Sequence, residues 1–216
     1  MNTVSKAMIN SRKSGRPDAD EAARIGEAIL AAAEAAFLTS GFSKASVQAI
    51  AAAAGTSKQT VFARFGSKER LFIAVSDALL KGRFSPMPAS VLPLRERLID
   101  VAAQALDAML DPRMVMMSSI ITGEAKRFPE LAQLANDDAT FAGRDLMRTV
   151  IAEAVDAGEL RCQDPGRAML MLQDMVLSSP LRAAVAGQGD MDAAWRQAWV
   201  SEAVDLFLNG LRPRAV

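Results

Sequence analysis

Apolar residues recur every three or four positions along most of the chain, which is the spacing of one face of an α-helix. The first such segment spans residues 18–40 and is followed by Gly41 and Phe42. Asp18, Asp20 and Glu21 stand at its start, where the helix dipole favours negative charge. The pattern predicts a first helix over 18–40, ended by Gly41, with Phe42 folding back on the helix end.

Three more helices are predicted in the N-terminal part, over 46–54, over 57–65, and from Ser67 onward. The segment 82–93, GRFSPMPASVLP, then contains three prolines and marks the best domain boundary in the chain. We therefore divide the chain into a flexible basic arm over 1–17, a domain over 18–83 and a C-terminal domain over 84–216.

Five longer helices are predicted in the C-terminal domain, separated by proline, glycine and aspartate positions. Their expected ranges are 94–110, 114–126, 129–157, 165–185 and 191–211. Aromatic residues make up only 5% of the chain, Tyr is absent, and no run alternates with period two. The sequence thus predicts an all-α fold, with a helical bundle following a smaller helical domain.

The distribution of charge points to a polyanionic partner for the first domain. Residues 1–85 hold 12 Lys and Arg against 7 Asp and Glu, while the remainder carries an equal excess of acidic residues. The protein has no His and a single cysteine, Cys162, so a His-ligated metal and a Ser-His or Cys-His nucleophile are excluded. We expect no metal, no cofactor, no enzymatic activity, no membrane span and no secretory signal, and hence a cytoplasmic location.

The segment 47–65 has the pattern of a helix-turn-helix. Two short helices that cross steeply need a small residue where they touch and a glycine in the turn, and Ala51 and Gly55 occupy those positions. Ile50, Ala54 and Val61 are spaced to fill the wedge between them. The sequence therefore predicts a helix-turn-helix over 46–65.

The polar residues after Gly55 then begin the second helix of the motif, the part that enters the DNA major groove. Ser57 is expected to cap it and is counted among the DNA-binding residues, and Lys58, Gln59 and Thr60 are expected to meet base edges. Other contacts, to phosphates or sugars, are expected from Ser46, Phe62, Arg64 and Lys68. In the arm, Arg16 is expected to lie along the DNA backbone or in the minor groove, together with Arg12 and Lys13.

The segment 29–72, ILAAAEAAFLTSGFSKASVQAIAAAAGTSKQTVFARFGSKERLF, resembles the N-terminal domain of TetR-type transcriptional regulators without a gap. The segments GEAKRFPELAQL and AGELRCQDPGRA resemble parts of the ligand-binding half of one large subgroup. The resemblance implies about nine helices, a homodimer, a palindromic operator and a small-molecule effector. Phe62 stands where the family usually has a phosphate-binding Tyr, so its contact should be apolar, and Thr56 replaces the usual Val.

Methionines concentrate in the C-terminal domain, where most are expected in the core and some around an apolar effector pocket. The residues assigned to this pocket are Met114, Met117, Glu124, Arg144, Met147 and Met175. The last two predicted helices have unusually wide apolar stripes, and in the family these helices form the dimer interface. The residues assigned to it are Leu170, Met171, Trp195, Trp199 and Leu206.

The main hypothesis is thus a dimeric, ligand-responsive repressor that binds double-stranded DNA. Two alternatives stay open at this point. One is an enzyme or carrier built on a helical small-molecule-binding bundle, and the other is a helical adaptor that binds another protein through its last helices. Both would lack DNA binding, so a gel shift with the DNA upstream of the gene separates them from the repressor.

Overall fold

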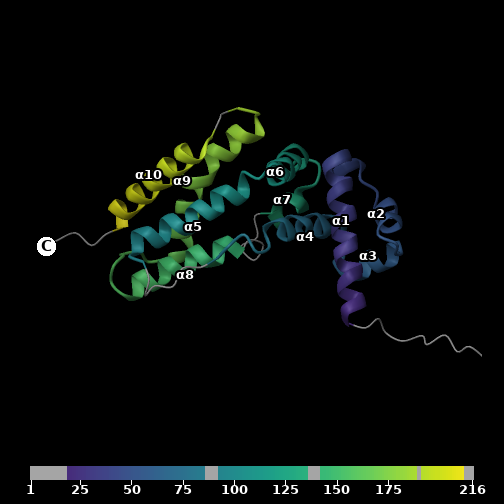
Figure 1. The fold of residues 1–216 in the computed structure, drawn as a ribbon, viewed down its shortest axis with the longest axis horizontal. Coiled ribbons are helices and arrows are strands. Elements are labelled where there is room, and N and C mark those ends of the chain that lie inside the picture. The colour runs from purple at the N-terminus through teal and green to yellow at the C-terminus, as the bar shows by residue number, and fades with distance from the viewer. Residues whose placement is uncertain (1–18, 86–91, 136–141, 189–190, 212–216) are drawn as a thin grey trace, which may run out of the picture.

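The computed structural model of the protein describes residues 19–85, 92–135, 142–188 and 191–211 (Figure 1). Within these ranges the chain forms ten helices and no strand, which confirms the all-α prediction. The first four helices are α1 (Ala19–Lys44), α2 (Val47–Ala53), α3 (Lys58–Phe65) and α4 (Lys68–Leu80). The others are α5 (Leu94–Met109), α6 (Pro112–Glu124), α7 (Pro129–Ala135), α8 (Ala142–Asp156), α9 (Pro165–Val185) and α10 (Ala193–Leu211).

A first hydrophobic core lies among α1, α2, α3 and α4. Phe37, Phe42 and Phe72 are fully buried at its centre, with ring centroids 5.0–6.0 Å apart. Backbone geometry is non-helical at Gly41, so α1 breaks there and Phe42 stacks on Phe37, as the sequence predicts. By length and hydropathy alone Asp20–Lys44 could also cross a membrane, but its apolar stripe is buried in this core.

Helices α6 and α7 belong to the first core as well, although they follow the proline-rich segment. Met114, Met117 and Leu131 are buried in the same cluster as Phe42 and Phe72. Phe128, between α6 and α7, meets the ring of Phe42 edge-on at a centroid distance of 4.9 Å. Helices α6 and α7 thereby form one packed unit with α1, α2, α3 and α4.

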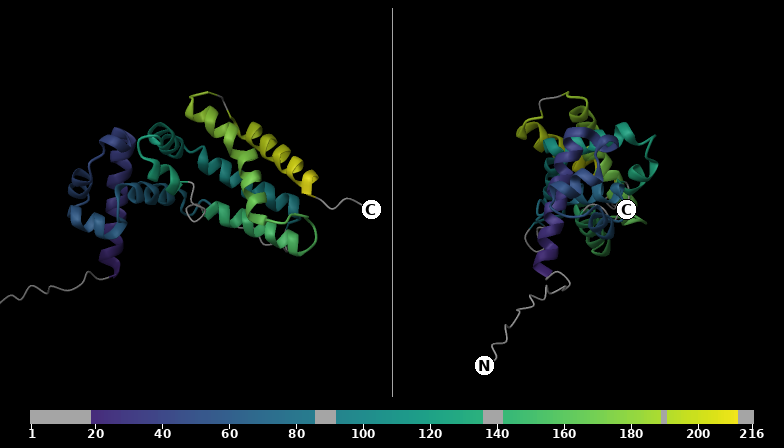
Figure 2. Two further views of the ribbon diagram at one scale, coloured as in Figure 1. Left: turned by 180° about the vertical axis from the view of Figure 1, so that it is seen from behind. Right: turned by 90° about the vertical axis from the view of Figure 1, so that its right-hand side faces the viewer.

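A second core is formed by α5, α8, α9 and α10. Leu98, Ile151, Leu172, Val176 and Val204 from these four helices are fully buried in it. Figures 1 and 2 show an elongated molecule in which α2 and α3 lie at one end, the second core lies at the other, and α4 points from the first toward the second.

The single helix predicted over 129–157 is wrong, because the structure has two helices in this range. Helix α7 packs on α4 and α6, whereas α8 packs on α5 and α9. Each of the two segments carries an apolar face with helical spacing, and that spacing alone was interpreted as one continuous helix. The prolines at the predicted domain boundary, except Pro93, lie outside the described residues.

Candidate nucleic-acid interface and internal cavity

The turn between α2 and α3 is built as the sequence predicts. Gly55 has a φ of 66°, a left-handed value that costs glycine little, and its N–H donates to Ala52 O while Thr56 N–H donates to Ala51 O. Ile50, Ala51 and Val61 are buried where the two helices meet. These contacts fix α3 at an angle to α2 on the outer side of α1 (Figure 1).

Serine side chains cap the short helices of this region. Ser46 Oγ accepts from Ala49 N–H at the start of α2, and Ser57 Oγ accepts from Thr60 N–H at 3.0 Å at the start of α3. The hydroxyls of Ser57 and Thr60 also lie 2.9 Å apart. Ser57 and Thr60 are therefore engaged in forming the helix end, while their neighbours project freely.

Lys58 and Gln59 are both exposed on the first turn of α3. Phe62 follows one turn later and is 37% exposed, which is unusual for a large apolar side chain. Lys58 Nζ lies 5.6 Å from the Phe62 ring centroid, within the range of a cation–π contact. Together these three residues form a small basic and apolar surface at the end of the molecule.

Two side chains that were predicted to contact phosphates, those of Arg64 and Lys68, make contacts inside the protein instead. Arg64 donates to Ala22 O at 2.8 Å and so ties α3 to α1. Lys68 donates to Ser43 O at 3.3 Å, and its Nζ lies 4.6 Å from the centroid of the Phe42 ring. Partial burial lowers the pKa of Lys68 by desolvation, although nearby Glu69 and Glu124 oppose this shift.

Sequence analysis did not single out two other polar residues beside Ser46. Lys44 and Gln48 are exposed on either side of that helix cap. The signal that could have found them is their position within one turn of the free N–H groups at the start of α2, where anions bind. Arg16 and the rest of the predicted arm over 1–17 lie outside the described residues.

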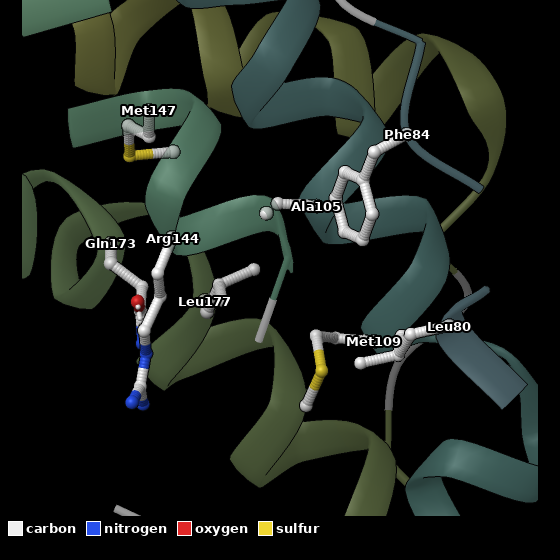
Figure 3. Close-up of a pocket in the computed structure, with 9 residues that line it drawn as sticks. Leu80, Phe84, Ala105, Met109, Arg144, Met147, Gln173 and Leu177 are labelled. Atoms are coloured by element: carbon white, nitrogen blue, oxygen red, sulfur yellow. Dashed lines mark hydrogen bonds between the residues drawn. The ribbon is translucent and has the colours of Figure 1, made fainter. Parts of the chain in front are cut away.

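A cavity of about 70 Å³ lies where α4 meets the second core (Figure 3). It is bounded by α4, α5, α8 and α9, and among the described residues that line it the polar side chains are those of Arg144 and Gln173. Arg144 Nε donates to Gln173 Oε1 at 2.9 Å. The lining residues are Leu80, Phe84, Ala105, Met109, Gly143, Arg144, Met147, Gln173 and Leu177.

The structure brings only two of the predicted pocket residues together in this cavity, Arg144 and Met147. Met114 and Met117 are instead buried in the first core, and Glu124 Oε1 accepts from Ser43 N–H at 3.3 Å. Met175 lies in a separate open groove between α9 and α10. Phe84, which sequence analysis left in the proline-rich segment, also lines the cavity, and its neighbour Ser85 is hydrogen-bonded to Gln104 on α5.

Four of the five predicted dimer residues form an exposed apolar surface on α9 and α10. Leu170, Met171, Trp195 and Leu206 are each exposed by 39% or more, which is far from typical for such side chains. Trp199 is half-buried, stacks on Trp195 at 5.3 Å and donates its indole N–H to Val176 O. The indole hydrogen bond of Trp199 thus ties this part of α10 to α9.

Comparisons with known proteins agree with this arrangement in both halves of the chain. The family model of bacterial regulatory proteins of the tetR family matches residues 29–75. The model described as the C-terminal domain of AefR-like transcriptional repressors matches residues 96–210, more than half of the chain. No curated protein was matched.

Solved structures similar to the chain include the flavonoid-responsive regulator FrrA, with 30% identity, a TM-score of 0.72, and coverage of 89% of this chain and all of that one. A TetR-family regulator from Pseudomonas syringae pv. tomato has 26% identity and a TM-score of 0.66, and the match covers 87% of this chain and 97% of that one. A third structure, from Mesorhizobium loti, shares the fold at 22% identity and a TM-score of 0.68, and the match covers 89% of this chain and 98% of that one. The chain belongs to the TetR family of DNA-binding transcriptional regulators.

Proposed function

We propose that the protein is a ligand-responsive repressor, acting in the cytoplasm, that binds a palindromic operator as a homodimer. The observation that carries this proposal is the first turn of α3, where Lys58 and Gln59 are exposed at the end of the molecule with Phe62 beside them. Lys can donate to guanine and Gln can pair with an adenine edge in the major groove.

The test of DNA binding is a gel shift with the DNA immediately upstream of the protein's own gene. A retarded complex that disappears when unlabelled upstream DNA is added, but persists when unrelated DNA is added, supports an operator in the upstream DNA. Binding that unrelated DNA removes equally well counts against an operator in this DNA. Failure to bind any DNA favours the alternative of a helical bundle that acts as a small-molecule carrier or a protein adaptor.

Operator affinity is expected to fall steeply as salt is raised. Each phosphate contact releases condensed counterions, so about four contacts predict a loss of about a hundredfold between 50 and 200 mM KCl. Fluorescence anisotropy with labelled operator at several KCl concentrations measures the slope. A slope near zero would mean that the basic N-terminal domain does not meet the DNA backbone.

The exposed apolar surface on α9 and α10 supports a homodimer, because aromatic and aliphatic side chains of this size concentrate at interface centres. Leu206→Glu, at a side chain 60% exposed, is expected to dissociate the dimer by burying an unpaired charge. The matched control is Met116→Glu, at a side chain on α6 that is 50% exposed. Sedimentation velocity at one concentration should show a monomer for Leu206→Glu and a dimer for Met116→Glu. If both variants are dimers, the dimer interface does not include Leu206.

The apolar cavity between the two cores supports a small-molecule effector. FrrA, at 30% identity, is described as flavonoid-responsive, so a response to a small molecule has a precedent in a similar protein. In a dimer the two copies of α3 must lie about 34–36 Å apart, or a multiple of this, to reach successive half-sites. An effector that prefers another separation would release DNA through a coupling of about 1–3 kcal/mol.

A further inference from the structure

The side chain of Phe84 occupies one end of the cavity. Its ring lies directly on the backbone of α8 at Gly143, so closely that a Cβ at that position would stand 2.6 Å from two ring carbons. Only glycine permits this approach, because any other residue would push the ring away. The ring therefore fills a flat site that exists because Gly143 has no side chain.

Contacts on both sides of Phe84 hold this segment in place. Arg83 Nε donates to Leu79 O at 3.0 Å, and its guanidinium pairs with Asp111, the N-cap of α6. Ser85 N–H donates to Gln104 Oε1 at 2.7 Å, and Gln104 Nε2 donates to Ser85 O at 3.2 Å. The position of the Phe84 ring is thus linked to α4, α5 and α6 by short, direct contacts.

We propose that Phe84 occupies the effector's own site, and that the effector is a small aromatic molecule whose ring replaces the Phe84 ring against Gly143. This inference rests on the proposed ligand response and names its site and its ligand class. At about 70 Å³ the cavity is smaller than the roughly 150 Å³ of an apolar cavity that holds benzene. Departure of the Phe84 ring supplies the missing space.

The lining also defines the chemistry of the ligand. Met109 and Met147 bring thioethers, which favour contact with aromatic rings, and the remaining apolar walls come from Leu80, Ala105 and Leu177. Arg144 and Gln173 lie at the side of the cavity away from Phe84 (Figure 3). A single flat ring with a polar substituent directed toward Arg144 and Gln173 matches this distribution.

Displacement of the Phe84 ring explains how a ligand in the cavity would affect the DNA-binding domain. The segment 83–85 would have to shift with the ring, which disturbs the contacts to Leu79, Asp111 and Gln104. Leu80, at the end of α4, lines the same cavity, and α4 packs on α1 and α3. Because the ring and the ligand compete for one site, binding and the DNA-competent arrangement exclude each other.

Ligand binding can be tested without DNA, with methionine-methyl labelled full-length protein and NMR titrations of benzyl alcohol. Phe84→Ala is expected to bind benzyl alcohol at least tenfold more tightly than wild type at Met109 and Met147, since the ring no longer competes. Cyclohexylmethanol, whose ring is puckered, should bind several-fold more weakly than benzyl alcohol. Equal or weaker binding to Phe84→Ala, or equal affinity for the two alcohols, overturns the proposal.

Gly143→Ala tests the same inference through the DNA. The new Cβ should expel the Phe84 ring and lower operator affinity at least fivefold with no ligand present, while Ala favours the helical backbone. Gly123→Ala, at a helical glycine with nothing within 4 Å, is the control and should have no effect. Added to Phe84→Ala, Gly143→Ala should cause no further loss.

If Gly143→Ala binds the operator like the wild type, the Phe84 ring does not control DNA binding. The same conclusion holds if Gly143→Ala lowers operator affinity equally in the wild type and in Phe84→Ala. If wild-type protein binds no operator, the proposed repressor function fails, while the NMR titration still decides whether Phe84 competes with an aromatic ligand. The two failures are therefore distinguishable. Methionine resonances outside the cavity at their wild-type positions establish that each variant is folded.

Discussion

Replacing Lys58 and Gln59 together by alanine is expected to reduce operator affinity by about a thousandfold or more. Both side chains are exposed on the first turn of α3 and take no part in either core. A base contact of this kind contributes about 1–3 kcal/mol, and a dimer makes each contact twice, so the combined loss is about 4 kcal/mol or more. Fluorescence anisotropy with the operator found by gel shift measures the change.

The matched control is Lys81→Ala combined with Gln188→Ala, which removes the same charge and amide from exposed positions outside α1, α2 and α3. It should bind operator like the wild type. Both double variants should keep the helical circular dichroism and the dimeric sedimentation of the wild type. Wild-type affinity in the Lys58 and Gln59 variant would refute the assignment of these residues to base contacts.

Capping and turn chemistry made the DNA-binding domain predictable from sequence. Gly41, Gly55 and Gly66 interrupt the helices at the expected places, and Ser57 and Ser67 cap the helices that follow. These features are local, since each depends on hydrogen bonds between residues within a few positions of one another. The helix boundaries of the first domain agree with prediction to within a few residues for this reason.

Partners distant in sequence were not predictable in the same way. Periodicity shows that Met114 and Met147 face a core, but not that the first belongs to the first core and the second lines the cavity. Likewise, the sequence gives no sign that Arg64 reaches Ala22 O. Such pairings depend on how α6, α7 and α8 turn relative to α1 and α4, which a hydrophobic pattern does not specify.

Phe42→Ala is expected to lower the free energy of unfolding by about 3–5 kcal/mol, the usual cost of removing a fully buried aromatic side chain. Phe42 is 0% exposed and contacts Phe37, Phe72 and Phe128 at centroid distances of 6.0, 5.6 and 4.9 Å. Because Phe128 follows α6, the substitution also weakens the attachment of α6 and α7 to the first domain.

The matched control is Phe62→Ala, which removes the same side chain from an exposed position on α3. Its effect on stability should stay within about 0.5 kcal/mol, as for most surface substitutions, while operator affinity falls because the apolar DNA contact is lost. Urea unfolding of both variants at one protein concentration measures the difference. A loss below about 1 kcal/mol in Phe42→Ala would mean that the aromatic cluster does not hold the first domain together, since cavity formation in a packed core cannot be that small.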